Sequence, residues 1–164
     1  MSEQKILNIV LSPVVYRGQI LLLKRAKEPF KDLWGMPGGK VEFGENIDTA
    51  IEREIREETG LPVKFTAVRG LVNETFHDSK TDKIEAQSII FVCEVHPAHN
   101  KHVDSVEGKL AWFKLKDWPK LKKQIIPSDY LMVERFIIRQ RQAISVNKVK
   151  MLQGREYKIS RTDL

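Results

Sequence analysis

The sequence predicts an α/β protein in which a mixed β-sheet lies between helices. Three observations support this prediction: apolar, β-branched runs typical of strands, two segments with helix signals, and Pro- and Gly-rich loops between them. The chain has 164 residues, of which 41% are hydrophobic and 30% charged, which is enough for one domain with a substantial core.

Five apolar runs are expected to form strands, at residues 6–16, 18–25, 63–72, 87–95 and 109–115. The segment 28–44 is rich in Pro and Gly and is expected to be a loop. The polar segment 73–86 is expected to be a second loop.

Two segments are expected to form helices. The first covers Ile47 to Thr59, because Gly60 and then Pro62 follow it as stop signals. The second is expected to begin at Ser128, a residue type favoured as an N-cap, and to run to about residue 142. Helices and strands thus follow one another along residues 1–143, which we take as one domain.

Composition and charge also limit the cellular compartments and partners to be expected. No apolar run approaches the roughly 20 residues that cross a bilayer, and the N-terminus carries Glu3 and lacks a signal-peptide cleavage pattern. With a single cysteine, Cys93, the chain is expected to be cytoplasmic and to act away from membranes. Residues 144–164 are expected to form a basic tail or an extension of the domain. Such a tail could attract nucleic acid, although a solubilising segment is the favoured reading.

The first predicted helix has carboxylates on its apolar face. At 100° per residue, Glu54 and Glu58 fall inside the apolar stripe, and Glu57 lies at its edge. Like charges at this spacing repel, and burying a carboxylate is costly. A hard cation such as Mg²⁺ removes both objections, and Arg53 could hold Glu57 in place. The alternative is a glutamate-rich surface helix with an imperfect stripe.

The loop before this helix and the helix itself resemble the signature of the Nudix hydrolase family. In that signature a Gly is followed after five residues by a Glu and after seven more by Arg-Glu-hydrophobic-x-Glu-Glu-x-Gly-hydrophobic. Here Gly39, Glu45 and the run from Arg53 to Leu61 occupy every fixed position. The preceding Trp-Gly-x-Pro-Gly-Gly, which starts at Trp34, looks like the family's usual lead-in. The resemblance implies an α/β/α sandwich along most of the chain.

The resemblance also implies a reaction: Mg²⁺-dependent hydrolysis of a nucleoside diphosphate linked to a group X, with Mn²⁺ as a substitute. Carried over by position, Glu54, Glu57 and Glu58 would bind the metal together with the carbonyl of Gly38, and Arg53 would orient a glutamate. A further carboxylate outside this stretch often acts as a ligand or base in the family. Glu107 is our first candidate, its alternative being an ordinary loop residue. The rival candidates for that role are Glu74, Asp78 and Glu85.

Four further residues are candidates for substrate binding. Trp34 and Phe43 could stack on a base, and His77 could touch the substrate or relay a proton, although a surface histidine is the simpler reading. In some nucleotide-sanitising Nudix enzymes an Asn or Asp near the position of Asp129 reads a purine edge. The alternative for Asp129 is favourable electrostatics at a helix start.

The favoured substrate is a nucleoside triphosphate, including oxidised forms. Alternatives are a nucleotide sugar or ADP-ribose, the 5′ end of an RNA, and a Nudix-fold module that binds nucleotides without catalysis. The expected partner is therefore a small-molecule nucleotide, with a second copy of the chain if it dimerises.

Overall fold

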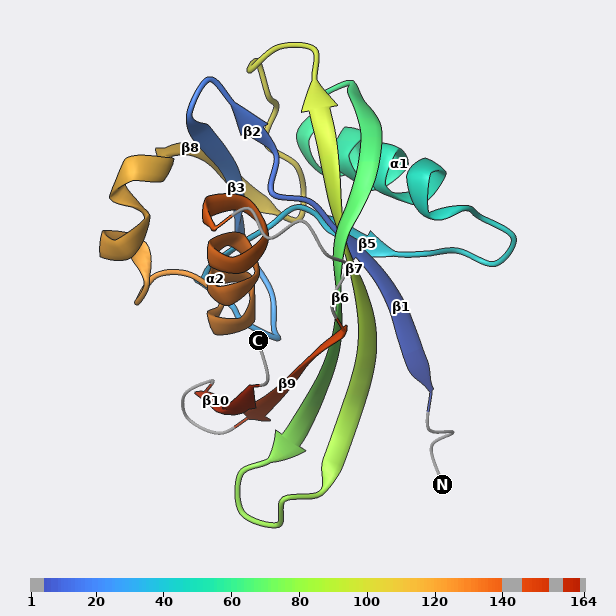
Figure 1. Ribbon diagram of the computed structural model, residues 1–164, viewed down its shortest axis with the longest axis vertical. Coiled ribbons are helices and arrows are strands. Elements are labelled where there is room, and N and C mark those ends of the chain that lie inside the picture. The colour runs from blue at the N-terminus through green and yellow to red at the C-terminus, as the bar shows by residue number, and fades with distance from the viewer. Residues whose placement is uncertain (1–4, 140–145, 154–157, 163–164) are drawn as a thin grey trace.

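The computed structural model describes residues 5–139, 146–153 and 158–162. Its strands form two sheets, here called sheet A and sheet B, with helix α1 (Ile47–Thr59) on one side and α2 (Pro127–Val133) on the other (Figure 1). The predicted α/β class with a mixed sheet between helices is therefore confirmed.

Sheet A has six strands in the order β10-β9-β6-β7-β1-β5. They are β1 (Ile6–Leu11), β5 (Gly38–Lys40), β6 (Val63–Asp78), β7 (Ile84–Pro97), β9 (Val146–Gln153) and β10 (Lys158–Thr162). β1 runs parallel to β7, while β6 runs antiparallel to β7, so the sheet is mixed. β9 pairs in parallel with β6 and extends the sheet. The boundary predicted at residue 143 lies outside the described residues.

Sheet B is built around β3 (Gln19–Arg25), which pairs with β2 (Val15–Tyr16), β4 (Trp34–Gly35) and β8 (Gly108–Lys114). Its side chains alternate between the two faces, as the period of a strand requires. Leu21 and Leu23 pack on the α1 side with Ile51, whereas Ile20 and Leu22 pack on the α2 side. The molecule thus has one apolar cluster under each helix.

Helix α1 has the predicted bounds. Gly60 ends it with a φ of 70°, and its N–H donates to the carbonyl of Arg56. Ala50, Ile51 and Ile55 are fully buried against the sheets, which fixes the face that the helix turns inward. Tertiary packing of this face stabilises the helix.

The predicted start of the second helix was wrong by one residue. Pro127 occupies the first turn, where its fixed φ suits the helix and its missing N–H costs nothing. Ser128 is therefore buried inside the first turn and does not act as the N-cap. A π-helical segment, η2 (Glu134–Ile138), follows directly, and a 3₁₀ helix, η1 (Leu115–Leu121), precedes α2. The predicted end near residue 142 lies outside the described residues. Among those residues, none of the helices has the length and apolar content to span a bilayer.

The loop predicted at 73–86 was also wrong. β6 and β7 continue through most of it as a long hairpin, and only residues 79–83 connect them (Figure 1). The polar side chains that suggested a loop include Glu74, which lies opposite Ser88, and both side chains are buried. Their polarity reflects a cavity beside the sheet rather than exposure to solvent.

Candidate active site

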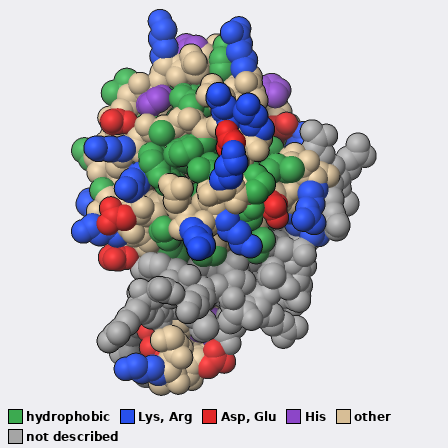
Figure 2. All heavy atoms as spheres, turned by 90° about the vertical axis from the view of Figure 1, so that its left-hand side faces the viewer, with side chains coloured by type: hydrophobic (Ala, Val, Ile, Leu, Met, Phe, Trp, Pro, Cys, Tyr) green, Lys and Arg blue, Asp and Glu red, His purple; other side chains and the backbone are tan. Residues whose placement is uncertain are grey.

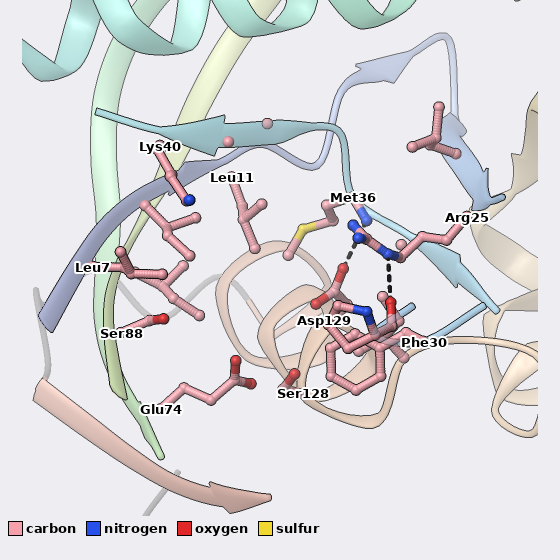
Figure 3. A pocket seen from close by; sticks show the side chains of 18 of the residues that line it. Leu7, Leu11, Arg25, Phe30, Met36, Lys40, Glu74, Ser88, Ser128 and Asp129 are labelled. Carbon is pink, nitrogen blue, oxygen red and sulfur yellow. Dashed lines mark hydrogen bonds between the residues drawn. The ribbon is translucent and has the colours of Figure 1, made fainter. Parts of the chain in front are cut away.

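A cavity of about 380 Å³ lies between sheet A and the start of α2 (Figure 3). Its walls are mostly apolar, with side chains such as Leu7, Leu11, Phe30 and Met36. Polar groups gather at two places. Near α1 they come from Glu58 and the glycines of β5, and at the far end from β6, β7 and α2. We call these the helix end and the deep end of the cavity.

Beside the helix end, Arg53 holds carboxylates of α1 in place, although Glu58 is the α1 residue that lines the cavity. Its guanidinium makes two hydrogen bonds of 2.9 Å to Glu45, one of 2.9 Å to Glu54 and one of 3.2 Å to Glu57. It also donates to the carbonyl oxygen of Lys40 at 3.1 Å, which ties the helix to β5. A planar guanidinium suits this role because its five N–H groups point in fixed directions.

The three glutamates of α1 differ in exposure. The side chain of Glu54 is 15% exposed and that of Glu57 is 61% exposed. Glu58 is largely buried, and its Oε2 accepts the N–H of Gly38 at 2.8 Å. The inward position of Glu54 and Glu58 agrees with the helical wheel, as does the edge position of Glu57.

Two glycines allow β5 to pass between α1 and β1. A Cβ on Gly39 would lie 2.6–2.7 Å from the carboxylate of Glu54. A Cβ on Gly38, whose φ is 141°, would lie 2.1 Å from the carbonyl oxygen of Val10. Side chains at these positions would push the strand away from the helix carboxylates.

Burial and like charges raise the pKa values of the helix carboxyls. Burial raises the pKa of Glu58 to about 7, the Gly38 N–H opposes this, and Glu54 and Glu107 add to it. Burial also raises the pKa of Glu54, against the lowering effect of Arg53. The structure therefore brings the exposed loop residue Glu107 into the electrostatic field of the same site.

These oxygen donors fit a hard divalent cation. Acidic groups that raise one another's pKa are stabilised by a positive charge among them, and Mg²⁺ and Mn²⁺ favour carboxylate and carbonyl oxygens. Within the described ranges, no three acidic, His or Cys side chains stand together as a preformed metal centre. In the arrangement seen, Arg53 holds Glu54 and Glu57, while Gly38 holds Glu58.

The deep end holds two buried carboxyls, Asp129 and Glu74. Oδ2 of Asp129 accepts the N–H of Met36 at 2.7 Å. Burial raises the pKa of Asp129 to about 7; the Met36 N–H opposes this, and the nearby Glu74 adds to it. Burial likewise raises the pKa of Glu74 to about 7, against a hydrogen bond with Ser128.

Two predicted stacking residues lie outside the cavity lining. Trp34 packs edge-on against Phe113, with ring centroids 4.9 Å apart. Phe43 lies in the loop between β5 and α1 and is fully exposed. Neither aromatic ring therefore faces the cavity in this structure.

Three other candidates on the β6–β7 hairpin are likewise not among the cavity residues. The ring of His77 is buried and hydrogen-bonds to the Asp82 carbonyl at 2.9 Å and the Thr75 hydroxyl at 3.0 Å. Asp78 accepts bonds from the connecting turn, and Glu85 is exposed.

Sequence reasoning missed several residues that line the cavity. Arg25 ends β3, Lys40 ends β5, and Ser88 lies on β7. Glu74 was considered only as a metal ligand or base. Residues 72–77 alternate between the two faces of β6, and this period of two could have predicted a strand with Glu74 pointing inward. The polar composition of the segment led to the prediction of a loop instead.

Comparison with known proteins gives a consistent result. The family model of the NUDIX domain matches residues 8–136. An ADP-ribose pyrophosphatase of Methanocaldococcus jannaschii is 38% identical over 103 residues, which cover 63% of this chain. The match spans only 59% of that relative's length. The nucleoside triphosphatase NudI of Escherichia coli is 30% identical over 117 residues, covering 66% of this chain and 82% of NudI.

A solved structure gives the same fold. The Mutator MutT protein from Bacillus halodurans superposes with a TM-score of 0.73, covering 96% of this chain and 98% of the other, at 23% identity.

Proposed function

The chain belongs to the Nudix hydrolase family, and from that premise we propose that it hydrolyses a phosphoanhydride bond of a nucleoside triphosphate with the help of Mg²⁺. The observation that carries this proposal is one cavity with two differently equipped ends. Its helix end offers hard oxygen ligands, and its deep end offers buried hydrogen-bonding groups.

At the helix end, Glu54, Glu57 and Glu58 would hold the metal together with the Gly38 carbonyl. When bound, the metal neutralises the diphosphate and acidifies a coordinated water. Arg53 fixes the direction of two of these carboxylates through its hydrogen bonds. Glu107 is the proposed additional carboxylate, because it lies in the field of Glu58.

Two cations that line the cavity are proposed to bind phosphate. Arg25 and Lys40 line the cavity at the ends of β3 and β5. Arg25 lowers the pKa of both Glu58 and Asp129, so its charge acts on both ends of the cavity. Its Nε donates to the Pro29 carbonyl at 2.8 Å, which fixes the guanidinium. A triphosphate that runs from the deep end to the helix end would pass these cations.

The deep end is proposed to bind the base, with Asp129 as one recognition group. The cavity volume lies near the lower end of the range for small-molecule sites, which suits one nucleoside. The names of the relatives point to two substrate classes, ADP-ribose and nucleoside triphosphates. We favour the triphosphate because ADP-ribose would add a second sugar to the same volume.

The face that bears η1 and α2 does not favour a nucleic-acid partner. Figure 2 shows the face that bears η1 and α2, where Lys and Arg side chains are scattered around an apolar area rather than gathered in one stripe. A polyanion binds best to continuous positive charge.

A substrate panel tests the proposal. The purified protein with Mg²⁺ is given nucleoside triphosphates, an oxidised triphosphate, ADP-ribose, a nucleotide sugar and triphosphorylated RNA, and the products are separated. We expect a nucleoside monophosphate and pyrophosphate from a triphosphate, and a loss of at least a hundredfold in Glu57→Gln. Asp48→Asn, a change to an acid on the opposite face of α1, is the matched control. If nothing is cleaved with any divalent metal, the chain is a binding module and the proposal is wrong.

A further inference from the structure

The strands β9 and β10 extend sheet A beyond the part of the chain that the family model matches. The match ends at residue 136, whereas β9 pairs with β6 and β10 pairs with β9 as two further strands. Figure 1 shows both strands beside the lower half of the long β6–β7 hairpin, away from α1. They have no part in the reaction proposed above.

The positive charge of the chain is concentrated in this extension. From Arg139 to the last residue, the sequence has seven Lys and Arg residues against two acidic residues. This segment therefore accounts for five of the six net positive charges of the chain. Charge that is gathered in one segment creates a local field that attracts an anionic partner.

The pairing of β9 with β6 puts two of these cations on the face of sheet A that is opposite to the cavity. In the parallel register, Lys148 lies opposite Asn73 and Lys150 lies opposite Thr75. Residues that lie opposite one another share a face of the sheet, and so do residues two apart in one strand. Because Glu74 lies between Asn73 and Thr75 and lines the cavity, these four positions belong to the other face.

The pairing of β10 with β9 adds two more cations to the same face. Arg161 lies opposite Lys150 in the antiparallel register. Lys158 lies opposite Leu152, which is two residues after Lys150 and therefore on its face. Four basic residues thus occupy positions on one face of two neighbouring strands.

Apolar residues of the extension take positions on the cavity side. Val149 lies opposite Glu74 on β6, and Met151 lies opposite Phe76. Ile159 on β10 lies opposite Met151 and shares this face. The two strands therefore have a basic face and an apolar face, a pattern typical of strands with one side packed on the protein and one side toward solvent.

On β6 and β7 the same face continues with uncharged polar residues. Asn73 and Thr75 are half-buried, whereas Val72 and Glu74 on the cavity side are buried. Gln87 on β7 is also half-buried, and its amide donates to Oδ1 of Asn73 at 3.0 Å. In Figure 1, α1 lies over the other end of the hairpin, so it leaves this half of the face open.

The acidic residues of this half of the hairpin lie on the cavity side or near the turn. Glu74 is buried on the cavity side. Asp78 accepts hydrogen bonds from the turn, and Glu85 is exposed near the start of β7. An anion that approaches Lys148 and Lys150 therefore meets uncharged neighbours on β6.

We propose that the face formed by β9, β10 and the adjoining part of β6 binds the phosphate backbone of a nucleic-acid duplex. Residues two apart in a strand are separated by about 7 Å and neighbouring strands by about 4.8 Å, so the four cations are spaced closely enough to neutralise several phosphates of a duplex. This gathered charge distinguishes the face from that of η1 and α2, where the cations are scattered.

The residue types on this face favour a duplex over other anionic partners. Single strands are held largely by stacking of bases on aromatic rings, and none of the residues named on this face is aromatic. Protein interfaces are rich in aromatic residues and poor in lysine, which is the opposite of the composition found here. The amides of Asn73 and Gln87 suit additional hydrogen bonds to phosphate oxygens.

Binding of a labelled DNA duplex to the full chain, followed by fluorescence anisotropy with EDTA present, tests the proposal without metal and without turnover. Affinity should fall as salt rises, and the plot of log K against log salt should have a slope of about −3 to −4, the value for four neutralised phosphates. A variant with glutamine at all four cation positions should bind at least a hundredfold more weakly at low salt, with a slope closer to zero by about 3. The four positions are Lys148, Lys150, Lys158 and Arg161.

A matched control removes the same charge from the face of η1. Its four positions, all exposed, are Lys114, Lys116, Lys120 and Lys123. Replacement of these four residues by glutamine should leave the affinity within about threefold of the wild type, because they lie outside the proposed face. If both fourfold variants lose affinity equally, net charge alone explains the binding and the proposal is overturned.

A single substitution tests the face even if the fourfold variant fails to fold. Asn73→Asp keeps the oxygen that accepts the Gln87 amide and adds one negative charge opposite Lys148. It should weaken duplex binding about three- to tenfold at low salt. Asn100→Asp, in an exposed loop, is the matched control and should leave binding unchanged. Wild-type affinity in Asn73→Asp would overturn the assignment of this face.

Competition with other polyanions identifies the partner. Unlabelled duplex should displace the labelled duplex at a lower charge concentration than either a single strand of the same sequence or poly-glutamate. If the single strand or poly-glutamate displaces it equally well, the assignment to a duplex is wrong. None of these measurements involves hydrolysis, so the proposed reaction and the proposed duplex site can fail separately.

Discussion

Replacement of Arg53 by lysine is expected to weaken metal binding while the fold persists. The guanidinium donates five hydrogen bonds, two to Glu45 and one each to Glu54, Glu57 and the Lys40 carbonyl. A lysine ammonium keeps the charge but donates from a single nitrogen, so it cannot reach all of these groups at once.

The structure gives the size of the effect. If two of the charged hydrogen bonds are lost at this partly exposed site, the free energy of unfolding should fall by about 1–3 kcal/mol. Misdirected carboxylates should raise the Mg²⁺ concentration for half-maximal activity about 10- to 100-fold. Arg53 also lowers the pKa of Glu54, so its weakening should move the acid limb of the pH–rate profile to higher pH.

The assay is a Mg²⁺ titration of nucleotide hydrolysis for Arg53→Lys, with thermal unfolding measured in parallel. Arg69→Lys is the matched control, since Arg69 pairs with Glu94 away from the cavity. An unchanged Mg²⁺ midpoint in Arg53→Lys, or an equal shift in the control, would refute the view that Arg53 positions the metal ligands.

Four further predictions address other parts of the structure. Gly39→Ala should lower activity and weaken metal binding at least tenfold, because its Cβ would meet the Glu54 carboxylate, and metal titration measures this. Gly70→Ala would meet an aromatic ring of the core, so unfolding measurements should show a loss of about 1–3 kcal/mol with the metal midpoint unchanged. Burial raises the pKa of Glu74 to about 7 from 4.5, so the folded state holds a proton that the unfolded state has lost. Glu74 alone should therefore lower the free energy of unfolding by about 2–3 kcal/mol from pH 5 to pH 8, in addition to the falls caused by Glu58 and Asp129, and Glu74→Gln should remove its share of this slope in denaturant titrations. Cys93 is buried and burial raises its pKa to about 12, so a thiol reagent should label it only after unfolding.

The helix end of the cavity could be predicted from the sequence because its information is local. The carboxylates of α1 lie within one helix, and the periodicity of a helix fixes which face each occupies. The glycines of β5 lie just before that helix, and the stop signal at Gly60 fixes its end. Strand pairing was not needed for these inferences.

Apart from Asp129, which the family resemblance suggested, the deep end could not be predicted because it depends on contacts between distant segments. Glu74, Ser88 and Asp129 meet only through the pairing of β6 with β7 and the packing of α2 on the sheet. A strand that faces a polar cavity carries polar residues and therefore has the composition of a loop. For this reason the segment 73–86 was predicted to be a loop. Trp34 is the opposite case, because its place beside the glycine-rich segment suggested a role in substrate binding. Its ring instead packs against Phe113 in sheet B.

Mn²⁺ binding, followed by electron paramagnetic resonance of the free ion, tests directly whether the carboxylates of α1 bind the metal. We expect the wild-type chain to bind Mn²⁺ and Mg²⁺ to displace it. Glu57→Gln and Glu58→Gln should each weaken binding at least tenfold, while Asp48→Asn should leave it unchanged. Wild-type affinity in both glutamate variants would contradict the assignment of the helix carboxylates as the metal site.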